Sequence, residues 1–380
     1  MYRILATRDV VVKPAVPNKL PRTDIDWKGL IPELGAANRA LARYNGVLLG
    51  IPNPEILLSP LTTQEAVLSS RIEGTRATLV EVLKHEAGEK LPQEQARLDV
   101  QEIMNYRRAL RSAETALHSR PFNLNLLLNL HSILMEDVRG RYRGRGRFRT
   151  VQNYIGPPGG DIEDAYFVPP DPSRVLEYMD NWEKYYHGEE RDPLVQLALI
   201  HAQFEVIHPF VDGNGRLGRM LVPLFLMEKE LLARPTFYIS SFFEARRQEY
   251  YEALRALDGA ETWNRWIRFF LNALVEQSSR NTDKAQQILA LRERLAERVL
   301  GLTRSRFAVP LLGRIFRQPI LVPTSLFPDE GLPTKPAVMT LLRKMRDEGM
   351  LLVLREPSGR RPQILALAEL VNLVEGRKVI

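Results

Sequence analysis

A run of twelve residues, from His208 to Arg219, contains the side chains best suited to chemistry in this chain. It reads His-Pro-Phe-Val-Asp-Gly-Asn-Gly-Arg-Leu-Gly-Arg. Histidine titrates near neutral pH and suits a general base, while aspartate is a hard oxygen ligand for a divalent cation. Glycines let a backbone close around an anion. Apolar residues at helical spacing follow from Met220, so the run is expected to begin a buried helix, whose N-terminus favours a phosphate.

The segment 213–218 also fits the pattern G-x-G-x-x-G, which binds dinucleotides in α/β folds. That pattern requires a β-strand before it. Residues 193–207 instead carry apolar side chains at helical spacing, and no strand pattern follows the run. We therefore reject a dinucleotide fold. A phosphate-binding Gly-Lys-Ser/Thr loop is absent as well.

The run resembles the motif of the Fic/DOC family, H-P-F-x-D/E-G-N-G-R-x-x-R, at all nine specified positions. Proteins of this family share an α-helical core, and most transfer the AMP moiety of ATP to a protein hydroxyl. Gly215 favours that reaction, because in the branch that resembles Doc a lysine stands there and ATP is used for phosphorylation. The resemblance implies ATP as substrate and a target protein with a Ser, Thr or Tyr hydroxyl.

Two residues of the run would act on the reacting groups. The target hydroxyl must lose a proton as it attacks the α-phosphorus, and His208 is suited to take it. Asp212 is suited to hold a Mg²⁺ that bridges the α- and β-phosphates. We expect His208 as the general base and Asp212 as the metal ligand.

The other polar residues of the run would hold the nucleotide. Asn214, with the backbone N–H groups around Gly213 and Gly215, would cradle the β-phosphate and the leaving pyrophosphate. Arg216 and Arg219 are three residues apart and share one helix face, so both could reach the γ-phosphate.

An upstream segment matches the family's inhibitory pattern, S/T-x-x-x-E-G/N, with Ser69 first, then Glu73 and Gly74. The residues from Thr63 are predicted to form a helix that ends near Gly74. By resemblance, Glu73 would pair with Arg219 and compete with the γ-phosphate for it. An ordinary exposed helix end is the alternative interpretation of this short pattern.

An irregular insertion is expected from 139 to 171. It opens with six arginines in eleven residues, 139–149, which could also be a short RNA-binding tract. Residues 151–156 and 166–170 suggest a β-hairpin, and related proteins place here a flap that aligns the target by strand addition. The flap residues expected to face nucleotide or target are Asp164, Ala165, Tyr166 and Phe167.

Tyr250 and Tyr251 match a tyrosine pair that lines the adenine pocket in relatives. An aromatic pair in a helical stretch is just as commonly part of a core. Both interpretations stay open from the sequence.

Composition agrees with a multi-part cytoplasmic protein. The chain has 380 residues, of which 44% are hydrophobic, and no cysteine, which excludes disulfides and thiolate zinc sites. Its six histidines show no metal-ligand spacing. The amino terminus lacks the apolar core of a secretory signal, and no apolar run approaches the ~20 residues that span a bilayer.

Composition and predicted secondary structure divide the chain into four parts. Residues 1–120 are expected to form a helical N-terminal extension with the inhibitory helix, and 121–275 the catalytic core. Residues 276–302 are expected to be a helical connector and 303–380 a winged helix. The predicted fold class is mainly α: a helical core of the Fic type with a short β-hairpin flap.

Residues 303–380 suggest contact with DNA. An amphipathic helix over 335–348 is followed by a hairpin with Arg360 and Arg361 at its tip, an arrangement that suits a duplex. This part has 13 Lys+Arg and 7 Asp+Glu, so it holds +6 of the net charge of +7. Winged helices also dock proteins, and Asp347 and Glu348 lie on the candidate recognition helix.

Three functions are therefore considered. The first is an autoinhibited AMP transferase that also modifies itself. The second is hydrolytic removal of AMP at the same site, with Glu73 positioning water. The third is a DNA-binding regulator whose core senses nucleotide. A homodimer is common among relatives and could mask or expose Glu73.

Overall fold

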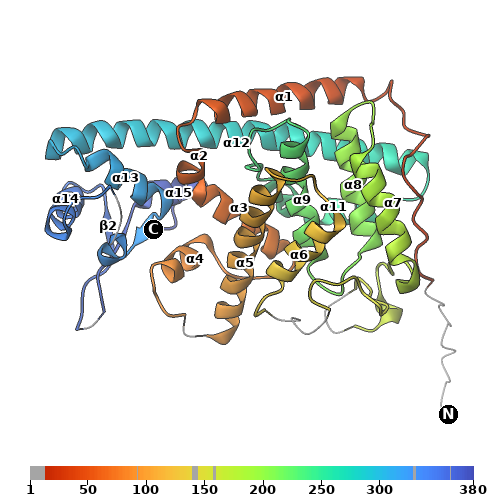
Figure 1. Ribbon diagram of the computed structural model, residues 1–380, viewed down its shortest axis with the longest axis horizontal. Helices are drawn as coiled ribbons and strands as arrows, with labels where there is room; N and C mark the ends of the chain where they lie inside the picture. The colour runs from red at the N-terminus through yellow and green to blue at the C-terminus, as the bar shows by residue number, and fades with distance from the viewer. Residues whose placement is uncertain (1–12, 92, 139–143, 157–159, 328–330, 360) are drawn as a thin grey trace, which may run out of the picture.

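The computed structural model describes residues 13–380 except 92, 139–143, 157–159, 328–330 and 360. The described chain is mainly helical, so the predicted fold class is confirmed in its main feature. Its longest helix, α12 (Ala260–Thr303), runs along the length of the molecule, and α1 (Ile31–Gly50) packs beside it (Figure 1).

The remaining elements follow the chain order shown in Figure 1. The other helices are α2 Pro54–Leu57, α3 Ser59–Ile72, α4 Leu79–Glu86, α5 Glu94–Leu117, α6 Leu124–Leu134, α7 Val175–His187, α8 Pro193–Ile207, α9 Asn214–Glu228, α10 Ser240–Ala245, α11 Arg247–Arg255, α13 Ala308–Arg317, α14 Lys335–Asp347 and α15 Ala368–Glu375. Short 3₁₀ turns are η1 Ile162–Asp164, η2 Pro172–Arg174 and η3 Pro323–Leu326, and the strands are β1 Ile320–Leu321, β2 Leu352–Arg355 and β3 Ile364–Ala366.

Helices α8 and α9 form the centre of the core and position the loop 208–213 between them. In α8 every residue except Pro193 and Val206 is buried, as expected for a helix that is apolar on all sides. Asp192 caps this helix, because its carboxylate accepts the N–H of Leu194. The predicted helix before the loop is confirmed, and this confirms that no strand precedes the G-x-G-x-x-G pattern.

Helix α3 brings the upstream segment to the core. It packs against α5, α9 and α10 and begins at Ser59, four residues before the predicted start at Thr63. Pro60 occupies its first turn, where a missing N–H costs nothing. The helix ends at Ile72 with Glu73 as its C-cap, and Gly74 follows with φ +97°, a conformation that glycine adopts without a Cβ clash. The end of α3 is therefore fixed at the residues that carry the predicted inhibitory pattern.

The C-terminal part packs against the first helices of the chain. Helix α12 passes without a break through 276–302, so the expected connector is its second half. The helix α14 and the strands β2 and β3 lie where the sequence predicts a helix and hairpin. The sequence did not predict β1, which pairs with β3 to complete an antiparallel sheet of order β1-β3-β2, or α15. Arg360, expected at the hairpin tip, lies outside the described residues.

Within the described residues, no helix combines the length and apolar character needed to cross a bilayer.

Candidate active site

A cleft of about 750 Å³ lies beside the loop between α8 and α9. Its lining brings together side chains from distant parts of the chain: Glu73, Glu205, His208 and Arg219, with the backbone of Gly215. Apolar and aromatic side chains, among them Tyr251, complete the wall. A concave, mostly apolar cleft with a few converging polar groups is the usual form of a small-molecule site.

His208 stands at the turn where α8 ends, with a left-handed backbone (φ +48°). A residue with a Cβ rarely adopts this conformation unless its surroundings hold it there. Arg149 supplies the restraint: its backbone N–H donates to the carbonyl of Pro209, and its Nε donates to the carbonyl of His208 at 2.9 Å. Its Nη2 also donates to the carbonyl of Pro170 at 2.5 Å. The last arginine of the run 139–149 is therefore a buried support for the loop 208–213.

The imidazole of His208 is neutral at physiological pH. Burial lowers its pKa to about 4, which outweighs the opposing effect of its bond to the carbonyl of Glu205. The sequence predicted titration near neutral pH, and burial accounts for the difference. Nδ1 lies 3.3 Å from the carbonyl oxygen of Glu205. A proton on Nδ1 satisfies that contact and leaves the lone pair on Nε2, as a general base requires.

The loop closes through Asn214, the first residue of α9. Its Oδ1 accepts the N–H of Phe210 at 2.8 Å, and its Nδ2 donates to the carbonyl of Phe210 at 2.7 Å. Gly213 caps the helix with φ +81°, which leaves the first backbone N–H groups of α9 at the end of the loop. The amide side chain thus shapes the loop, and the groups that remain available to an anion here are those of the backbone.

Asp212 lies on the outer side of this loop. Its side chain is 48% exposed, and Arg216 Nη2 approaches its Oδ1 at 3.4 Å. Asp212 does not line the cleft that contains His208. A single accessible carboxylate fits Mg²⁺, which is commonly held by one or two carboxylates together with substrate phosphates. The described residues contain no group of three or more His, Cys, Asp or Glu side chains that could hold a metal by themselves.

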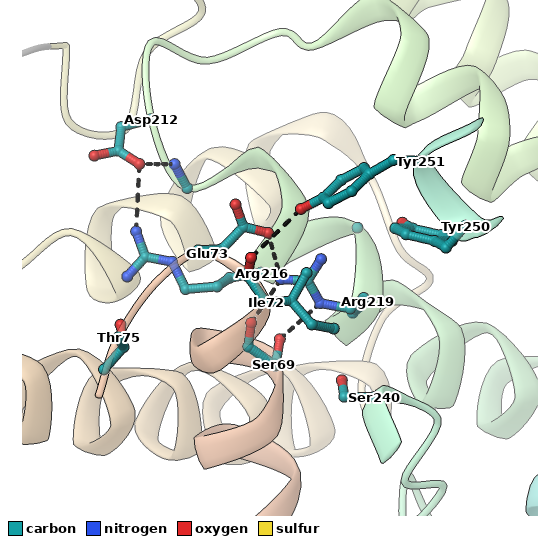
Figure 2. Close-up of polar contacts among 12 residues, drawn as sticks. Ser69, Ile72, Glu73, Thr75, Asp212, Arg216, Arg219, Ser240, Tyr250 and Tyr251 are labelled. Atoms are coloured by element: carbon teal, nitrogen blue, oxygen red, sulfur yellow. Dashed lines mark hydrogen bonds and ion pairs between the residues drawn. The ribbon is translucent and has the colours of Figure 1, made fainter. Parts of the chain in front are cut away.

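Arg219 joins α9 to the end of α3. Its Nε donates to the hydroxyl of Ser69 at 3.0 Å, and its Nη2 donates to the carbonyl of Ser69 and to Glu73 Oε1, the latter at 2.7 Å. Figure 2 shows Ser69 and Glu73 converging on this guanidinium. The structure therefore brings Ser69 and Glu73 of the upstream pattern together with Arg219.

The electrostatics favour the charged form of this pair. Burial opposes ionisation of Glu73, but the charge of Arg219 and its hydrogen bond, and then the charge of Arg216, hold the pKa of Glu73 below its usual value. Gly215 gives the carboxylate room: a Cβ at this position would lie 2.2 Å from Glu73 Oε1. The side chain of Glu73 remains 35% exposed, whereas that of Arg219 is 1% exposed. Arg219 is thus a fixed cation and Glu73 its accessible partner.

Arg216 forms a second buried ion pair that the sequence did not reveal. Its Nη1 donates to Glu102 Oε2 at 2.9 Å, and both side chains are almost fully buried. Thr75 also donates to Glu102. Glu102 belongs to α5, 114 residues before Arg216, and no local motif links the two. The geometry gives Arg216 a role in fixing α9 against α5.

Glu205 is another missed residue. It lies one turn before His208 on α8, lines the cleft, and its Oε1 has no hydrogen-bond partner in the described structure. Burial raises its pKa to about 8, although the charge of Arg219 opposes this rise. In the sequence, only the position of Glu205 one helical turn before His208 could have pointed to it. At neutral pH this carboxyl is protonated, so it does not compete with Glu73 for Arg219.

The tyrosine pair divides between core and cleft. Tyr250 is buried, stacks on Phe243 and shares a hydrogen bond of 2.9 Å with His201 Nε2. Tyr251 lines the cleft, and its hydroxyl donates to the carbonyl of Ile72 at 3.5 Å (Figure 2). Only Tyr251 is thus placed for contact with a bound molecule.

The flap segment forms the opposite wall. Its described pairing is one antiparallel bridge between Ile155 and Phe167, narrower than the predicted hairpin. Tyr166 and Phe167 line the cleft, and Tyr166 is 59% exposed. Asp164 belongs to the turn η1, and Ala165 follows it; neither lines the cleft.

Sequence comparison places this arrangement in a family. Residues 121–226, which include α8, the loop and the first part of α9, match the Fic/DOC family, and residues 31–115 match the Fic/DOC family N-terminal region. The chain belongs to the Fic/DOC family. The match 31–115 contains the whole of α3 and Glu73.

Curated relatives of this family member match over short segments. The protein adenylyltransferase fic-1 of Caenorhabditis elegans is 31% identical over 121 residues, which are 28% of this chain and 22% of that protein. The protein adenylyltransferase Fic of Drosophila virilis is 36% identical over 85 residues, 22% of this chain and 16% of that protein. The similarity thus spans about a fifth of the length of these relatives, and the relationship is distant.

Solved structures share the fold over most of the chain. A Fic family protein from Desulfovibrio desulfuricans has a TM-score of 0.56 at 20% identity and covers 93% of this chain and 98% of its own. A Fic domain containing signaling protein from Bacteroides thetaiotaomicron has a TM-score of 0.54 at 19% identity, covering 67% of this chain and 96% of its own. The fold is therefore that of a Fic protein, with a small antiparallel sheet near its C-terminus.

Proposed function

We propose that this Fic protein transfers the AMP moiety of ATP to a hydroxyl side chain of a protein, and that Glu73 restrains the reaction. The observation that carries the proposal is the convergence of His208, Arg219 and Glu73 on one cleft beside the first turn of α9. The cleft supplies a neutral base, backbone N–H groups and a buried guanidinium. These are the groups that nucleotidyl transfer from a polyphosphate needs.

In the proposed reaction, the target hydroxyl oxygen attacks the α-phosphorus of ATP. The hydroxyl proton passes to His208 Nε2, the new bond joins that oxygen to phosphorus, and the bond to the β-phosphate oxygen breaks. Pyrophosphate leaves against the N-terminus of α9, where the dipole and unpaired N–H groups favour negative charge. Mg²⁺, held by Asp212, would neutralise charge on the phosphates.

Glu73 would act as a restraint because its carboxylate pairs with the Arg219 guanidinium, which would otherwise bind the γ-phosphate. Arg219 is already satisfied by Ser69 and Glu73, so a phosphate must displace a charge-assisted hydrogen bond of 2.7 Å to reach it. The contact joins parts of one chain, so the restraint would act in cis. A nucleotide that binds without Arg219 would have its α-phosphate misaligned for in-line attack.

The target would lie along the flap. Exposed Tyr154 and Tyr166 flank the bridge Ile155–Phe167, and Arg255 lies over the Tyr166 ring at 5.5 Å. An extended segment could pair with this edge and present its hydroxyl to His208. Self-modification is expected when the protein is concentrated.

The test is incorporation of label from α-³²P-ATP with Mg²⁺, comparing wild type, Glu73→Gly and His208→Ala. Glu189→Gly is the matched control, because Glu189 is exposed in a loop and lines no part of the cleft. We expect strong labelling of protein in Glu73→Gly, weak labelling in wild type and Glu189→Gly, and none when His208→Ala is added to Glu73→Gly. Absence of label in Glu73→Gly, with a lysate supplied as target, would refute the transferase proposal.

Removal of AMP from a modified target is the second function that the site favours. Glu73 and His208 line the same cleft, so the carboxylate could orient a water towards a bound phosphodiester. In this case Glu73→Gly would abolish release of AMP from a pre-labelled target. Under the transferase proposal the same substitution increases labelling, so one variant separates the two.

For residues 303–380 we propose a winged helix that contacts duplex DNA, the third function considered. Arg343 and Lys344 are exposed on α14, directly before the hairpin β2–β3. Arg346 instead pairs with Asp347 at 2.7 Å, which reduces its availability to a phosphate. Fluorescence anisotropy with a labelled duplex should show weaker binding for R343Q/K344Q than for wild type. Equal binding by both would refute this role.

A further inference from the structure

A second cleft, of about 450 Å³, opens where the first and last parts of the chain meet. Its walls come from α4, α5, α13 and η3, with the first residue of α3, and it shares no residue with the cleft that contains His208. In Figure 1 these elements are the orange helices α4 and α5 and the blue helix α13. Four arginines line it, together with a single acidic side chain, Glu86: they are Arg107, Arg111, Arg314 and Arg317.

Arg107 is the buried base of this cluster. The residue is 7% exposed, and its Nη1 donates to Glu86 at 2.5 Å. Its Nε is buried and has no hydrogen-bond partner within the described residues. Buried donors are almost always satisfied in folded proteins, so this guanidinium has hydrogen-bonding capacity that the described chain does not use.

The arginines repel one another across the cleft. Arg111 lies one helical turn after Arg107 on α5, and Arg317 ends α13 on the facing side. Burial, and then the charges of Arg107 and Arg317, lower the pKa of Arg111, while Glu86 and Glu114 act in the opposite direction with smaller effect. Like charges gathered around one cavity destabilise the empty site and favour an anion in it.

We propose that this cleft binds a small phosphate-bearing anion. Guanidinium groups match phosphate oxygens through paired N–H donors, and Ser59, Gln318 and Ser325 add neutral polar groups to the lining. The volume falls in the range of small-molecule sites. A DNA backbone is the less favoured occupant, because Arg107 is only 7% exposed and presents little surface to a duplex.

The first test is isothermal titration with inorganic tripolyphosphate. The variant R111Q/R317Q removes the two exposed arginines of the rim and leaves buried Arg107 in place. Its matched control is R43Q/R97Q, which removes the same charge from exposed positions on α1 and α5 that line neither cleft. We expect affinity to fall about tenfold or more in R111Q/R317Q, and by less than about twofold in the control. Equal loss in both variants, or no loss in either, overturns the proposal.

A second measurement locates the anion, since tripolyphosphate could also bind at the start of α9. Crystals soaked in tungstate, a phosphate mimic, should give an anomalous peak between Arg111 and Arg317. A peak at residues 213–219 alone overturns the proposal, and so does loss of duplex DNA binding in R111Q/R317Q with unchanged tripolyphosphate affinity. The melting temperature of R111Q/R317Q without ligand should equal or exceed that of wild type, because repulsion is relieved. These readouts do not depend on AMP transfer, so they stand whatever the outcome of the labelling test.

Discussion

Glu205 gives a prediction whose size follows from the structure. The residue is 9% exposed, and one carboxyl oxygen has no partner among the described residues. Burial raises its pKa from 4.5 to about 8, so the fold favours the protonated carboxyl. The stability that this group contributes is complete below its unfolded pKa and is lost as the pH rises towards the folded pKa. Glutamine has nearly the same shape and cannot ionise.

Each pH unit between the two pKa values corresponds to about 1.4 kcal/mol of lost stability. Between about pH 5 and about pH 7, wild type should therefore lose roughly 3 kcal/mol relative to Glu205→Gln, if no other group changes. Urea unfolding of both proteins at the two pH values measures this difference directly. Glu189→Gln, at an exposed loop position, is the control and should track wild type.

The result that would refute the reasoning is a gap between Glu205→Gln and wild type that stays constant with pH. A constant gap would mean that Glu205 is ionised throughout and that Arg219 compensates its burial.

Three further predictions concern the support of the site. Replacing Arg149 with lysine removes the fork that bridges the carbonyls of His208 and Pro170, so the rate of label incorporation in a Glu73→Gly background should fall about tenfold with unchanged circular dichroism. An unchanged rate would show that the left-handed turn at His208 keeps its conformation without the contacts of Arg149. Glu102→Ala leaves buried Arg216 without this carboxylate and should lower the free energy of unfolding by about 3–5 kcal/mol, measured in urea; a loss below about 1 kcal/mol would contradict a buried ion pair. Because the pKa of Glu73 is held below 4.5, the charge of Glu73 and its restraint are lost only below that pH. The ratio of labelling in Glu73→Gly to labelling in wild type should therefore be the same at about pH 6 and about pH 8. A ratio that falls towards one at the lower pH would argue against the ion pair.

The elements around the site could be predicted from local sequence patterns. Residues 193–207 are apolar at helical spacing, and α8 occupies those positions. Gly213 marks the turn into α9, because a positive φ at a helix start favours glycine. The strand β1 was missed, since two residues have no measurable period and pair with residues 44 and 46 positions further along the chain. Its position depends on contacts that no short window contains.

The residues of the site also divide into those that local sequence identifies and those that only tertiary packing brings into place. The contiguous run 208–219 and the pattern from Ser69 to Glu73 could be recognised from residue types and spacing alone. Their meeting, Arg219 with Glu73 at 2.7 Å, was expected by resemblance and has its physical cause in the packing of α3 against α9. The use of Asn214 to hold Phe210 could not be predicted, since an amide can serve a phosphate or a backbone equally well.

By itself the sequence determined which residues could do chemistry, because identity and short spacing are local properties. Only the tertiary structure decided their environment. Burial sets His208 neutral and protonates Glu205. Packing of α5 against α9 places Glu102 beside Arg216, and α5 and α13 bring Arg107 and Arg317 to one cleft. Desolvation and Coulomb interaction depend on distances between segments that lie a hundred or more residues apart in the chain. Those distances exist only once the core has formed.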